Sequence, residues 1–426
     1  MPDFSKPKPH LPPTNLPPIT AVARLCLSAG LLLLQTGASG RMVHEAIKEI
    51  ANALGCDSVE VFCQHAAILV TIRRGDESLM QMSKAGEHGV NFRRDEAVRE
   101  IIHQLMAGKL NCAQAQEAIE QVPVTTPKYP VWFVCLSTGL ACSAFGRLLG
   151  SDWQSFLPTL IGSAGGQWLR HTLFHRRHNI FVIAAVVSFV AAFVAALGAR
   201  LSGSSHAPVA TVAAVLLLVP GVAVLNAQVD ILEGKTQSRR RPCLARLLFA
   251  HLYGPRARPR PGSGPATSMM TSLLHLLHQA FFGGVAAMGF AVLFNCRPRM
   301  LPHCFAAGAL ALATRTIGQE NGLSLAGASF FSALLLAIVD KVWRDSPSSR
   351  GSILAVVGSI PMIPGSLAAK ALISVFAFLR SGQSQGPAVV IATWDNLIML
   401  FSTLAAIGTA LALPSLIPVV RSPDEV

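Results

Sequence analysis

Long apolar runs separated by short polar or basic connections fill the chain from residue 130 onward. A transmembrane helix needs about 20 mostly apolar residues, so runs of this kind predict membrane spans. Nine runs occur, at residues 131–149, 153–169, 179–199, 207–226, 273–295, 301–317, 322–340, 353–379 and 387–413. The pattern predicts a multi-pass α-helical membrane protein with two successive helical bundles, residues 129–234 and 272–420.

Residues 1–128 mix apolar and charged positions at helix and strand spacing, which is typical of a water-soluble region. Residues 1–18 are proline-rich and are predicted to be a disordered tail, and residues 19–128 are predicted to form an α/β domain. Helices are predicted at 19–36, 40–54, 94–107 and 112–121, and strands at 58–65, 67–73 and 79–82. The apolar run 25–34 imitates a signal peptide, but it is too short to span a bilayer and is predicted to be a buried helix.

The composition agrees with a membrane protein, because the mean hydropathy is +0.48 and only 13% of the 426 residues are charged. The net charge of +13 comes largely from arginines in the connections. This is the pattern of cytoplasmic loops rather than of a nucleic-acid site. The nine cysteines include no C-x-x-C pair, so free thiols are expected, and no metal or other cofactor is predicted.

Two of the predicted spans are interrupted by proline and glycine, at 216–221 (Leu-Leu-Leu-Val-Pro-Gly) and 360–365 (Ile-Pro-Met-Ile-Pro-Gly). A proline inside a membrane helix removes a backbone donor and frees a carbonyl, which is costly unless a polar group satisfies it. Each break falls in the fourth span of its bundle, and residues 139–146 align with 284–290, so an internal repeat is predicted. Broken helices at matching positions of a repeated membrane protein indicate a transport site.

The basic connections predict that the α/β domain lies in the cytoplasm. Connections expected on its side carry Arg170, Arg176, Arg177 and the arginine-rich stretch 235–260. The second bundle obeys the same rule only if the chain crosses the membrane once more between residues 234 and 272. The segment 235–271 offers half a span, and it is interpreted either as a basic linker or as a degenerate fifth span. An extra crossing there would make the two bundles inverted repeats.

Several of these segments resemble the threonine/serine exporter (ThrE) family, most closely its two-polypeptide form, YjjP followed by YjjB, here fused in one chain. The matching residues are 23–26, 30, 35, 37–38 and 55–60 in the soluble domain, 216–221, 225–227, 230 and 234 in the first bundle, and 289–295 and 360–365 in the second. The resemblance implies ten spans, five in each half, whereas nine are visible here. It also implies proton-driven export of threonine and serine, or, for the two-polypeptide branch, of a dicarboxylate such as succinate.

The candidate substrate and proton pathway combines the breaks with polar residues inside apolar runs. Amides at a broken helix suit a carboxylate, freed carbonyls suit an ammonium group, and charges in hydrocarbon are expensive unless they serve a function. The candidates are Pro220, Gly221, Asn226, Asp230, Asn295, Pro361, Pro364, Gly365, Lys370, Asp395 and Asn396. Asp230 and Asp395 are the candidate proton carriers, with a helix cap as the alternative for Asp230. Arg315 is interpreted as a residue that snorkels to the membrane surface.

The function predicted is secondary-active export of a small polar metabolite across a bacterial inner membrane. Its partners would be the small amino acid or dicarboxylate substrate, protons and the lipid bilayer, with no nucleic acid, and a homo-oligomer is compatible with the sequence. One alternative is a membrane-anchored enzyme that uses Cys63 and His65, which alternate on a predicted strand. Another is an interaction protein that transports nothing. His171, His175 and His178 lie among arginines, which disfavours a metal site.

Overall fold

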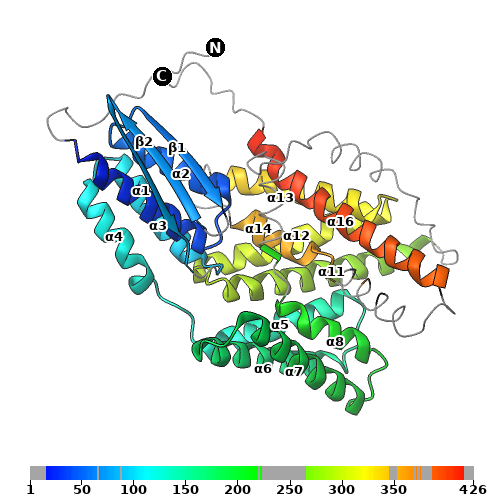
Figure 1. Cartoon of the computed structure of the whole chain (residues 1–426). Helices are drawn as coiled ribbons and strands as arrows, with labels where there is room; N and C mark the ends of the chain where they lie inside the picture. Colours follow the sequence, from blue (N-terminus) through cyan, green and yellow to red (C-terminus); the bar gives the residue numbers. More distant parts are fainter. Residues whose placement is uncertain are drawn as a thin grey trace. The chain divides into compact units, whose positions relative to one another are not determined.

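The computed structural model describes residues 16–64, 67–86, 89–218, 221–222, 265–344, 353–365, 367, 371, 375 and 386–416. These residues form two compact units. The first unit holds the described residues up to Lys128 together with Phe294–Arg297, and the second holds the others. In Figure 1 the elements of the first unit run from blue to cyan, and the helices of the second run from teal to red.

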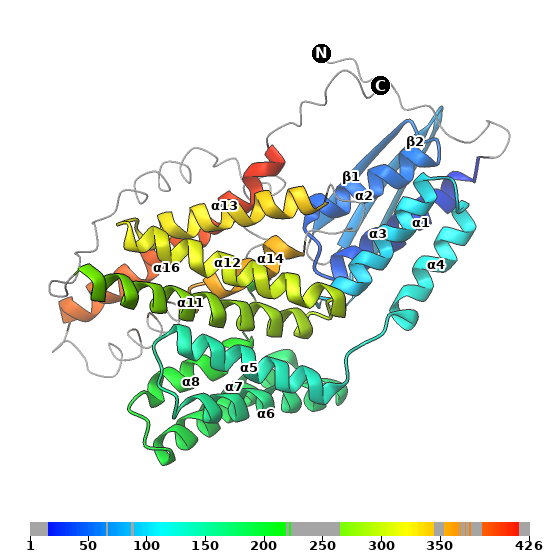
Figure 2. The ribbon, with the colours of Figure 1, turned by 180° about the vertical axis from the view of Figure 1, so that it is seen from behind.

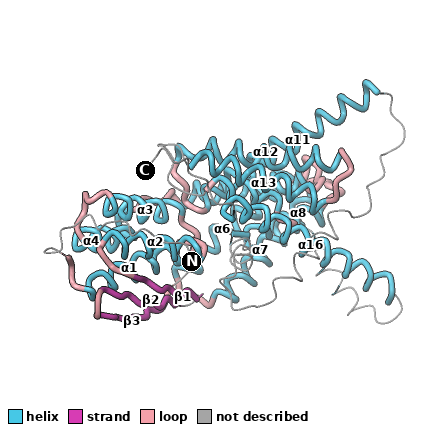
Figure 3. The backbone as a smooth tube through the Cα atoms, turned by 90° about the horizontal axis from the view of Figure 1, so that it is seen from above, coloured by secondary structure: helices cyan, strands magenta, loops and turns pink. Residues whose placement is uncertain are grey.

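The first unit packs four helices on one face of a three-stranded antiparallel sheet. The strands are β1 (Ser58–Gln64), β2 (Ala67–Arg74) and β3 (Glu77–Lys84), in the order β1-β2-β3. The helices are α1 (Ile19–Gln35), α2 (Gly40–Ala53), α3 (Phe92–Met106) and α4 (Cys112–Thr125). They all lie on the same side of the strands (Figure 3). Each element begins and ends within a few residues of the helix or strand predicted from the sequence.

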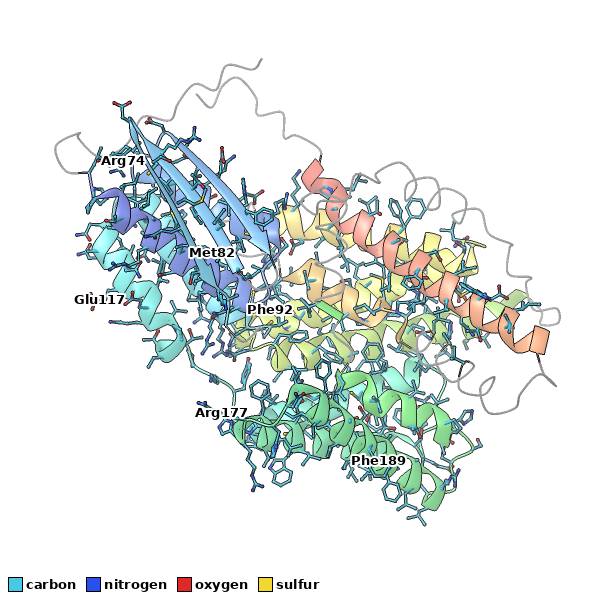
Figure 4. All side chains as sticks on the ribbon, viewed as in Figure 1. Arg74, Met82, Phe92, Glu117, Arg177 and Phe189 are labelled. Carbon is cyan, nitrogen blue, oxygen red and sulfur yellow. The ribbon has the colours of Figure 1, made fainter. Side chains whose placement is uncertain are left out.

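The alternation of buried and more exposed residues along β2 explains why the helices cover one face of the sheet. Ile68, Val70 and Ile72 are fully buried against the helices, because successive strand residues point to opposite faces of a sheet. Apolar positions of α1 and α2, such as Leu25 and Ile47, complete the core. The other face of the sheet is open within the described residues, and Met82 lies there, 65% exposed (Figure 4).

The first helical bundle lies in the second unit. It contains α5 (Val131–Leu148), α6 (Phe156–His175), α7 (Ile180–Leu201) and α8 (Ala207–Val215), followed by the 3-10 turn η2 (Leu216–Leu218). Small residues bring the helix backbones together, since a Cβ added to Gly162 of α6 would lie 2.7 Å from the backbone oxygen of Ala191 on α7. Helix α7 exposes large apolar side chains such as Phe189 (Figure 4), as a lipid-facing surface does.

The second helical bundle contains α11 (Pro265–Leu293), α12 (Leu301–Glu320), α13 (Leu325–Arg344) and α16 (Gly386–Leu416). The turn η3 (Pro298–Met300) precedes α12, and the short helix α14 (Leu354–Ser359) continues directly into the turn η4 (Ile360–Met362). Helix α12 contacts both α11 and α13, and α13 also packs on α16 (Figure 2). Small residues again allow close packing, here of α11 against α12, because a Cβ on Gly283 would lie 2.9 Å from the backbone oxygen of Gly308.

Helices α5 and α11 pack against each other in opposite directions. Near the start of α5, a Cβ added to Gly289 of α11 would lie 2.5 Å from the backbone oxygen of Ser137. Near the end of α5, a guanidinium nitrogen of Arg147 lies 3.5 Å from the ring of His278 on α11. Residue numbers therefore rise along one helix as they fall along the other. The C-terminal end of α11 lies beside the N-terminal end of α5.

Five described helices are long and apolar enough to cross a membrane: Val131–Leu148, Ile180–Leu201, Met270–Leu293, Leu325–Trp343 and Val390–Pro414. Each coincides with one of the predicted runs, which confirms that these runs are helical and is consistent with a membrane protein. Helices α6 and α12 occupy the predicted runs 153–169 and 301–317. The runs 207–226 and 353–379 are interrupted at the places where proline predicts a break.

Candidate functional site

Both breaks begin as turns that tighten the end of a helix. In the first bundle α8 ends at Val215 and passes into the 3-10 turn η2. In the second, α14 ends after 6 residues, η4 follows, and Pro364 lies outside any helix. The cause is local, because Pro361 and Pro364 have no backbone N–H to donate to the preceding turn.

The backbone of the second break keeps its hydrogen bonds through short-range turns. The N–H of Ile363 donates to the carbonyl of Ile360 at 3.1 Å, and the N–H of Gly365 donates to the carbonyl of Ile363 at 2.8 Å. The carbonyl of Met362 instead accepts a hydrogen bond from a side chain, that of Arg315 on α12, at 3.2 Å. The break is therefore a stable conformation, because these carbonyls have donors.

The two breaks lie against each other in the second unit. A Cβ added to Gly221, in the first break, would lie 2.7 Å from Cδ1 of Ile363, in the second. A Cβ added to Gly365 would lie 2.7 Å from Cδ2 of Leu216. Each glycine thus leaves just enough room for an apolar side chain of the other break. Both glycines and Pro364 are buried, so the breaks meet inside the bundle.

Arg315 is the charged residue that the structure adds to this site. A helical side chain leans toward the N-terminus of its helix, so the guanidinium of Arg315 reaches back along α12 toward η4 instead of out past the end of the helix. Within the described residues no carboxylate pairs with it. Because the guanidinium bonds to the carbonyl of Met362, the snorkelling interpretation from the sequence was wrong. A signal was available, since a lone arginine in an apolar run is by itself a candidate for function.

A buried carboxylate supports the segment that leads into the second break. Asp340 of α13 is 1% exposed, and its Oδ1 accepts hydrogen bonds from the N–H groups of Leu354 at 3.1 Å and Ala355 at 3.3 Å. These are donors that the start of α14 leaves without helical partners. In the sequence, Asp340 is the last residue of the apolar run 322–340. This position indicates the end of a membrane span and does not reveal that the carboxylate caps another helix.

Helix α6 contributes polar groups beside the first break. The hydroxyl of Ser163 donates to the carbonyl of Thr159 at 2.8 Å and points also at the carbonyl of Ala214, 3.4 Å away, in the last turn of α8. A Cβ on Gly166 would lie 3.4 Å from Leu217 of η2. Gln167 follows directly and is buried, and its Oε1 has no partner among the described groups. In the sequence, a serine and a glutamine within the apolar run 153–169 could have indicated that this face of α6 lies beside polar backbone.

The other predicted pathway residues lie either outside the described residues or away from the two breaks. Pro220, Asn226, Asp230 and Lys370 lie outside the described residues. Asp395 is exposed on α16 and Asn396 is half-buried beside it. Asn295 belongs to the first unit, where its amide bonds to Asn91 and to the carbonyl of Pro127. The structure therefore brings together Gly221, Pro361, Pro364 and Gly365, with Arg315 added.

A second polar cluster joins two connections of the first bundle. Ser204, between α7 and α8, donates its hydroxyl to the carboxylate of Asp152, between α5 and α6, at 2.8 Å. His206 lies 3.4 Å from the same carboxylate. Desolvation raises the pKa of Asp152, but the hydrogen bonds from Ser204, Ser155 and His206 together outweigh it and hold this pKa well below its usual range. The carboxylate stays ionised and ties the two connections at one end of the bundle.

The residues behind the alternative functions give little support to them. Cys63 is half-buried on β1, opposite Ile68, and His65 lies outside the described residues. Burial raises the pKa of the Cys26, Cys56 and Cys112 thiols, which makes them poor nucleophiles. No cluster of three metal-ligating side chains occurs in the part of the chain that the structure describes.

Two family models match this chain in succession. One, described as "Putative threonine/serine exporter", matches residues 24–252. The other, described as "Threonine/Serine exporter, ThrE", matches residues 279–417. The resemblance seen in the motifs is thereby confirmed, and the two matches agree with a fusion of two halves.

Curated relatives match either about half of this chain or nearly all of it. The "Probable succinate transporter subunit YjjP" of Klebsiella aerogenes is 32% identical over 215 residues, which are 50% of this chain and 83% of the relative. The Escherichia coli protein of the same name is 31% identical over 215 residues, with the same coverage. An "Uncharacterized protein" of Haemophilus influenzae is 22% identical over 401 residues, 93% of this chain and 95% of that protein. No solved structure matches the chain.

Proposed function

Because this chain belongs to the threonine/serine exporter family, we propose that it is a secondary-active exporter and that its substrate is a small dicarboxylate of the succinate class. The observation that carries the proposal is the meeting of the two broken helices beside Arg315. Irregular backbone at membrane depth is tolerated where it lines a path or is buried in protein, and paired breaks of this kind bind substrate in transporters of known architecture.

The charge of Arg315 favours an anion over a zwitterion. A guanidinium inside an apolar bundle is costly unless it has an anionic partner. The carbonyl of Met362 satisfies one donor but leaves the positive charge uncompensated, and the described residues supply no carboxylate for it. A substrate carboxylate can accept two parallel hydrogen bonds from the planar guanidinium. A dicarboxylate thus supplies the charge that this site lacks.

The substrate pathway of the proposal consists of Gly221, Pro361, Pro364 and Gly365 with Arg315. Asn396 and Asp395, and the candidates Pro220, Asn226, Asp230 and Lys370 outside the described residues, extend it. Asp395 and Asp230 are its proton carriers, since a carboxylate that binds a proton can cross hydrocarbon without charge. Coupling of this kind would let the proton gradient drive export.

The opposite directions of α5 and α11 support inverted repeats with ten spans. If α5 leaves the cytoplasm, then α11 enters it, and α11 must begin outside. Four crossings by α5 to α8 would return the chain to the cytoplasm, so one more crossing is needed, as the sequence predicts for the segment between residues 234 and 272. That arrangement places Arg297 and Arg299 inside, as the positive-inside rule requires, and it agrees with a cytoplasmic α/β domain in a bacterial inner membrane.

Counterflow in proteoliposomes tests the proposal. The purified full-length protein is reconstituted with internal succinate, threonine or serine, and uptake of the labelled compound is measured against protein-free liposomes. We expect exchange of succinate, faster net efflux when an imposed pH gradient favours proton entry, and little exchange of threonine or serine. Exchange of threonine alone would overturn the dicarboxylate assignment. No exchange of any of the three would leave the interaction protein as the better explanation.

Threonine and serine form the second candidate class, because both family descriptions name them. The carbonyls of the second break could bind an ammonium group, and an amide near Gly365 a carboxylate. The substrate panel above separates the two classes directly. The family descriptions name exporters and no enzyme, so a membrane-anchored enzyme is not proposed.

A further inference from the structure

The short connection Phe294–Arg297, between α11 and η3, is folded into the first unit. The N–H of Phe92, the first residue of α3, donates to the carbonyl of Phe294 at 3.0 Å. The rings of these two phenylalanines meet edge to face, with centroids 6.0 Å apart. The connection is therefore held by the start of α3 through both backbone and side chain.

Asn295 is the centre of this contact. Its Nδ2 donates to Oδ1 of Asn91 at 3.2 Å and to the carbonyl of Pro127 at 3.1 Å, and its side chain is buried. Its φ of 56° lies in the left-handed region, which asparagine enters more readily than most residues but still at a cost. The same Oδ1 of Asn91 caps α3 by accepting from the N–H of Arg94 at 3.2 Å.

Two arginines complete the contact from opposite sides. The guanidinium of Arg93, on α3, donates two hydrogen bonds from different nitrogens. One goes to the carbonyl of Cys296 at 3.3 Å, and the other goes to the carbonyl of Pro127 at 3.2 Å. Arg297 of the connection forms an ion pair with Glu96 of α3, with 2.8 Å between Nε and Oε2. Because Glu96 is mostly buried, this pair is better shielded from solvent than an ordinary surface pair.

The residues that make this contact come from two parts of the chain that match different family models. Asn91, Phe92, Arg93, Glu96 and Pro127 lie within 24–252, and Phe294–Arg297 lie within 279–417. The curated relatives called subunits match 215 residues, 50% of this chain and 83% of their own length. The contact thus joins two segments of the chain that different family models match.

We propose that the surface formed by Asn91, Phe92, Arg93, Glu96 and Pro127, here called the α3 cradle, is a docking site that recognises the α11–α12 connection of the second half. Its partner is a tight turn that presents two backbone carbonyls, a left-handed asparagine amide and an arginine. In this fused chain the cradle receives a segment of the same polypeptide. The covalent link between residues 253 and 264 is then dispensable for holding the halves together.

The cradle also has a mechanical consequence. Pro127 precedes α5 by a few residues along the chain, and Asn295 comes two residues after the end of α11, so the amide of Asn295 bonds to a segment that leads into α5. Loss of the cradle should therefore loosen the pairing of the halves before it disturbs either half.

A cleavable version of the full-length protein tests this inference. A protease site is placed between residues 255 and 262, the two ends carry different tags, and the purified protein is cleaved in detergent. We expect the halves of the otherwise unchanged chain to co-elute. Asn295→Asp keeps the size of the side chain but replaces the donor by an acceptor facing two other acceptors, and we expect at least a threefold loss of co-elution.

Controls separate docking from general damage. Asn321→Asp, at the exposed opposite end of α12, makes the same chemical change away from the cradle and should leave co-elution unchanged. Glu96→Arg and Arg297→Glu should each weaken co-elution, and the double exchange should restore it in part. Equal co-elution of wild type and Asn295→Asp, across increasing detergent, would overturn the inference. So would failure of the double exchange to recover any co-elution.

Discussion

The guanidinium of Arg315 donates a hydrogen bond to the main-chain carbonyl of Met362, 3.2 Å away, at the turn that breaks the second bundle. The bond has two consequences. It satisfies a carbonyl of an interrupted helix, and it holds a positive charge where the Pro-Gly segments of both bundles meet. A single residue thus links the conformation of the break to the electrostatics of the proposed substrate site.

Substitution of Arg315 should separate charge from packing. Arg315→Gln retains donors but loses the charge, and we expect succinate counterflow to fall roughly tenfold or more, because hydrogen bonds to charged groups contribute about 1.5–3 kcal/mol. Arg315→Lys keeps the charge without the planar fork and should retain part of the activity. Arg200→Gln, exposed at the end of α7, is the matched control and should transport normally. Full activity of Arg315→Gln would contradict the anion assignment.

Filling the space between the breaks should impair transport more than stability. Gly365→Val places branched carbon atoms where even a Cβ would lie 2.7 Å from Cδ2 of Leu216, so either that side chain or the breaks themselves must move. We expect transport to drop at least fivefold while detergent-solubilised protein remains folded. Gly165→Ala is the control, because a Cβ there meets nothing within 4 Å. Normal counterflow by Gly365→Val would show that close approach of the breaks is not required.

Helix packing in the second bundle makes a prediction for stability. A Cβ at Gly308 would lie 2.5 Å from the backbone oxygen of Gly283, which cannot move aside as a side chain can. Gly308→Ala should therefore destabilise the protein by about 1–3 kcal/mol through overpacking. The measurement is the thermal midpoint in detergent, with Gly165→Ala as the control. An unchanged midpoint for Gly308→Ala would mean that α11 and α12 are less closely packed than described.

The cap at the start of α14 can be tested by two substitutions at one position. Asp340→Ala removes the acceptor for the N–H groups of Leu354 and Ala355, and we expect a loss of about 1–3 kcal/mol because both donors are buried. Asp340→Asn keeps an acceptor oxygen and should cost clearly less. Thermal unfolding in detergent measures both. If the two variants unfold at the same temperature, the hydrogen bonds to α14 do not carry the effect.

Asp152 predicts a pH dependence with a definite sign. Its pKa in the folded protein lies below the ordinary value of about 3.9, so its contribution to stability is fully present above that value. The contribution is lost as the pH falls further toward the folded pKa. We expect Asp152→Asn to unfold at a lower temperature than wild type at pH 7, and the difference to shrink below about pH 4.

The control for this pH series is Glu117→Gln, which removes one exposed carboxylate from α4. It should show no comparable difference from wild type at either pH. A gap between wild type and Asp152→Asn that stays constant from pH 7 to pH 3 would mean that the ionised carboxylate is not the stabilising group.

The direction of α11 predicts the membrane topology. A cysteine introduced at Thr267, at the start of α11, should react with an impermeant maleimide added outside intact cells, and a reporter fused to Val426 should give a cytoplasmic signal. Both follow if one more crossing lies between residues 223 and 264. A Val426 reporter on the outer side would exclude the inverted arrangement, and α5 and α11 would then have to pair differently.

Local sequence determined most of the secondary structure. Alternating apolar residues in 67–73 place Ile68, Val70 and Ile72 on one face, and a strand and its buried side follow from that spacing. Apolar runs of span length likewise predicted α5, α7, α13 and α16, and the apolar part Met270–Leu293 of α11, within a few residues. The positions of the breaks were predictable too, because a proline lacks its N–H in any surroundings.

Tertiary structure alone decided which of these residues act together. Ile363 and Gly221 are more than a hundred residues apart, and their meeting depends on how α8 and α14 pack among their neighbours. Arg315 was misjudged from its place near the end of a run, since the sequence does not reveal the carbonyl that its side chain can reach. Asn295 was expected in the pathway, and the structure shows its amide bonded to Asn91 and Pro127 of the α3 cradle.

The physical reason is the range of the interactions. Spacing, backbone donors and hydrophobic length act within a few residues, and the amino-acid sequence of a segment carries them completely. Hydrogen bonds and charges satisfied across the fold depend on which segments pack together, and many residues far apart in the chain must fold before these contacts exist. The sequence thus determined the helices, the strands and the two interruptions of this protein, and packing determined that the interruptions face each other beside an arginine.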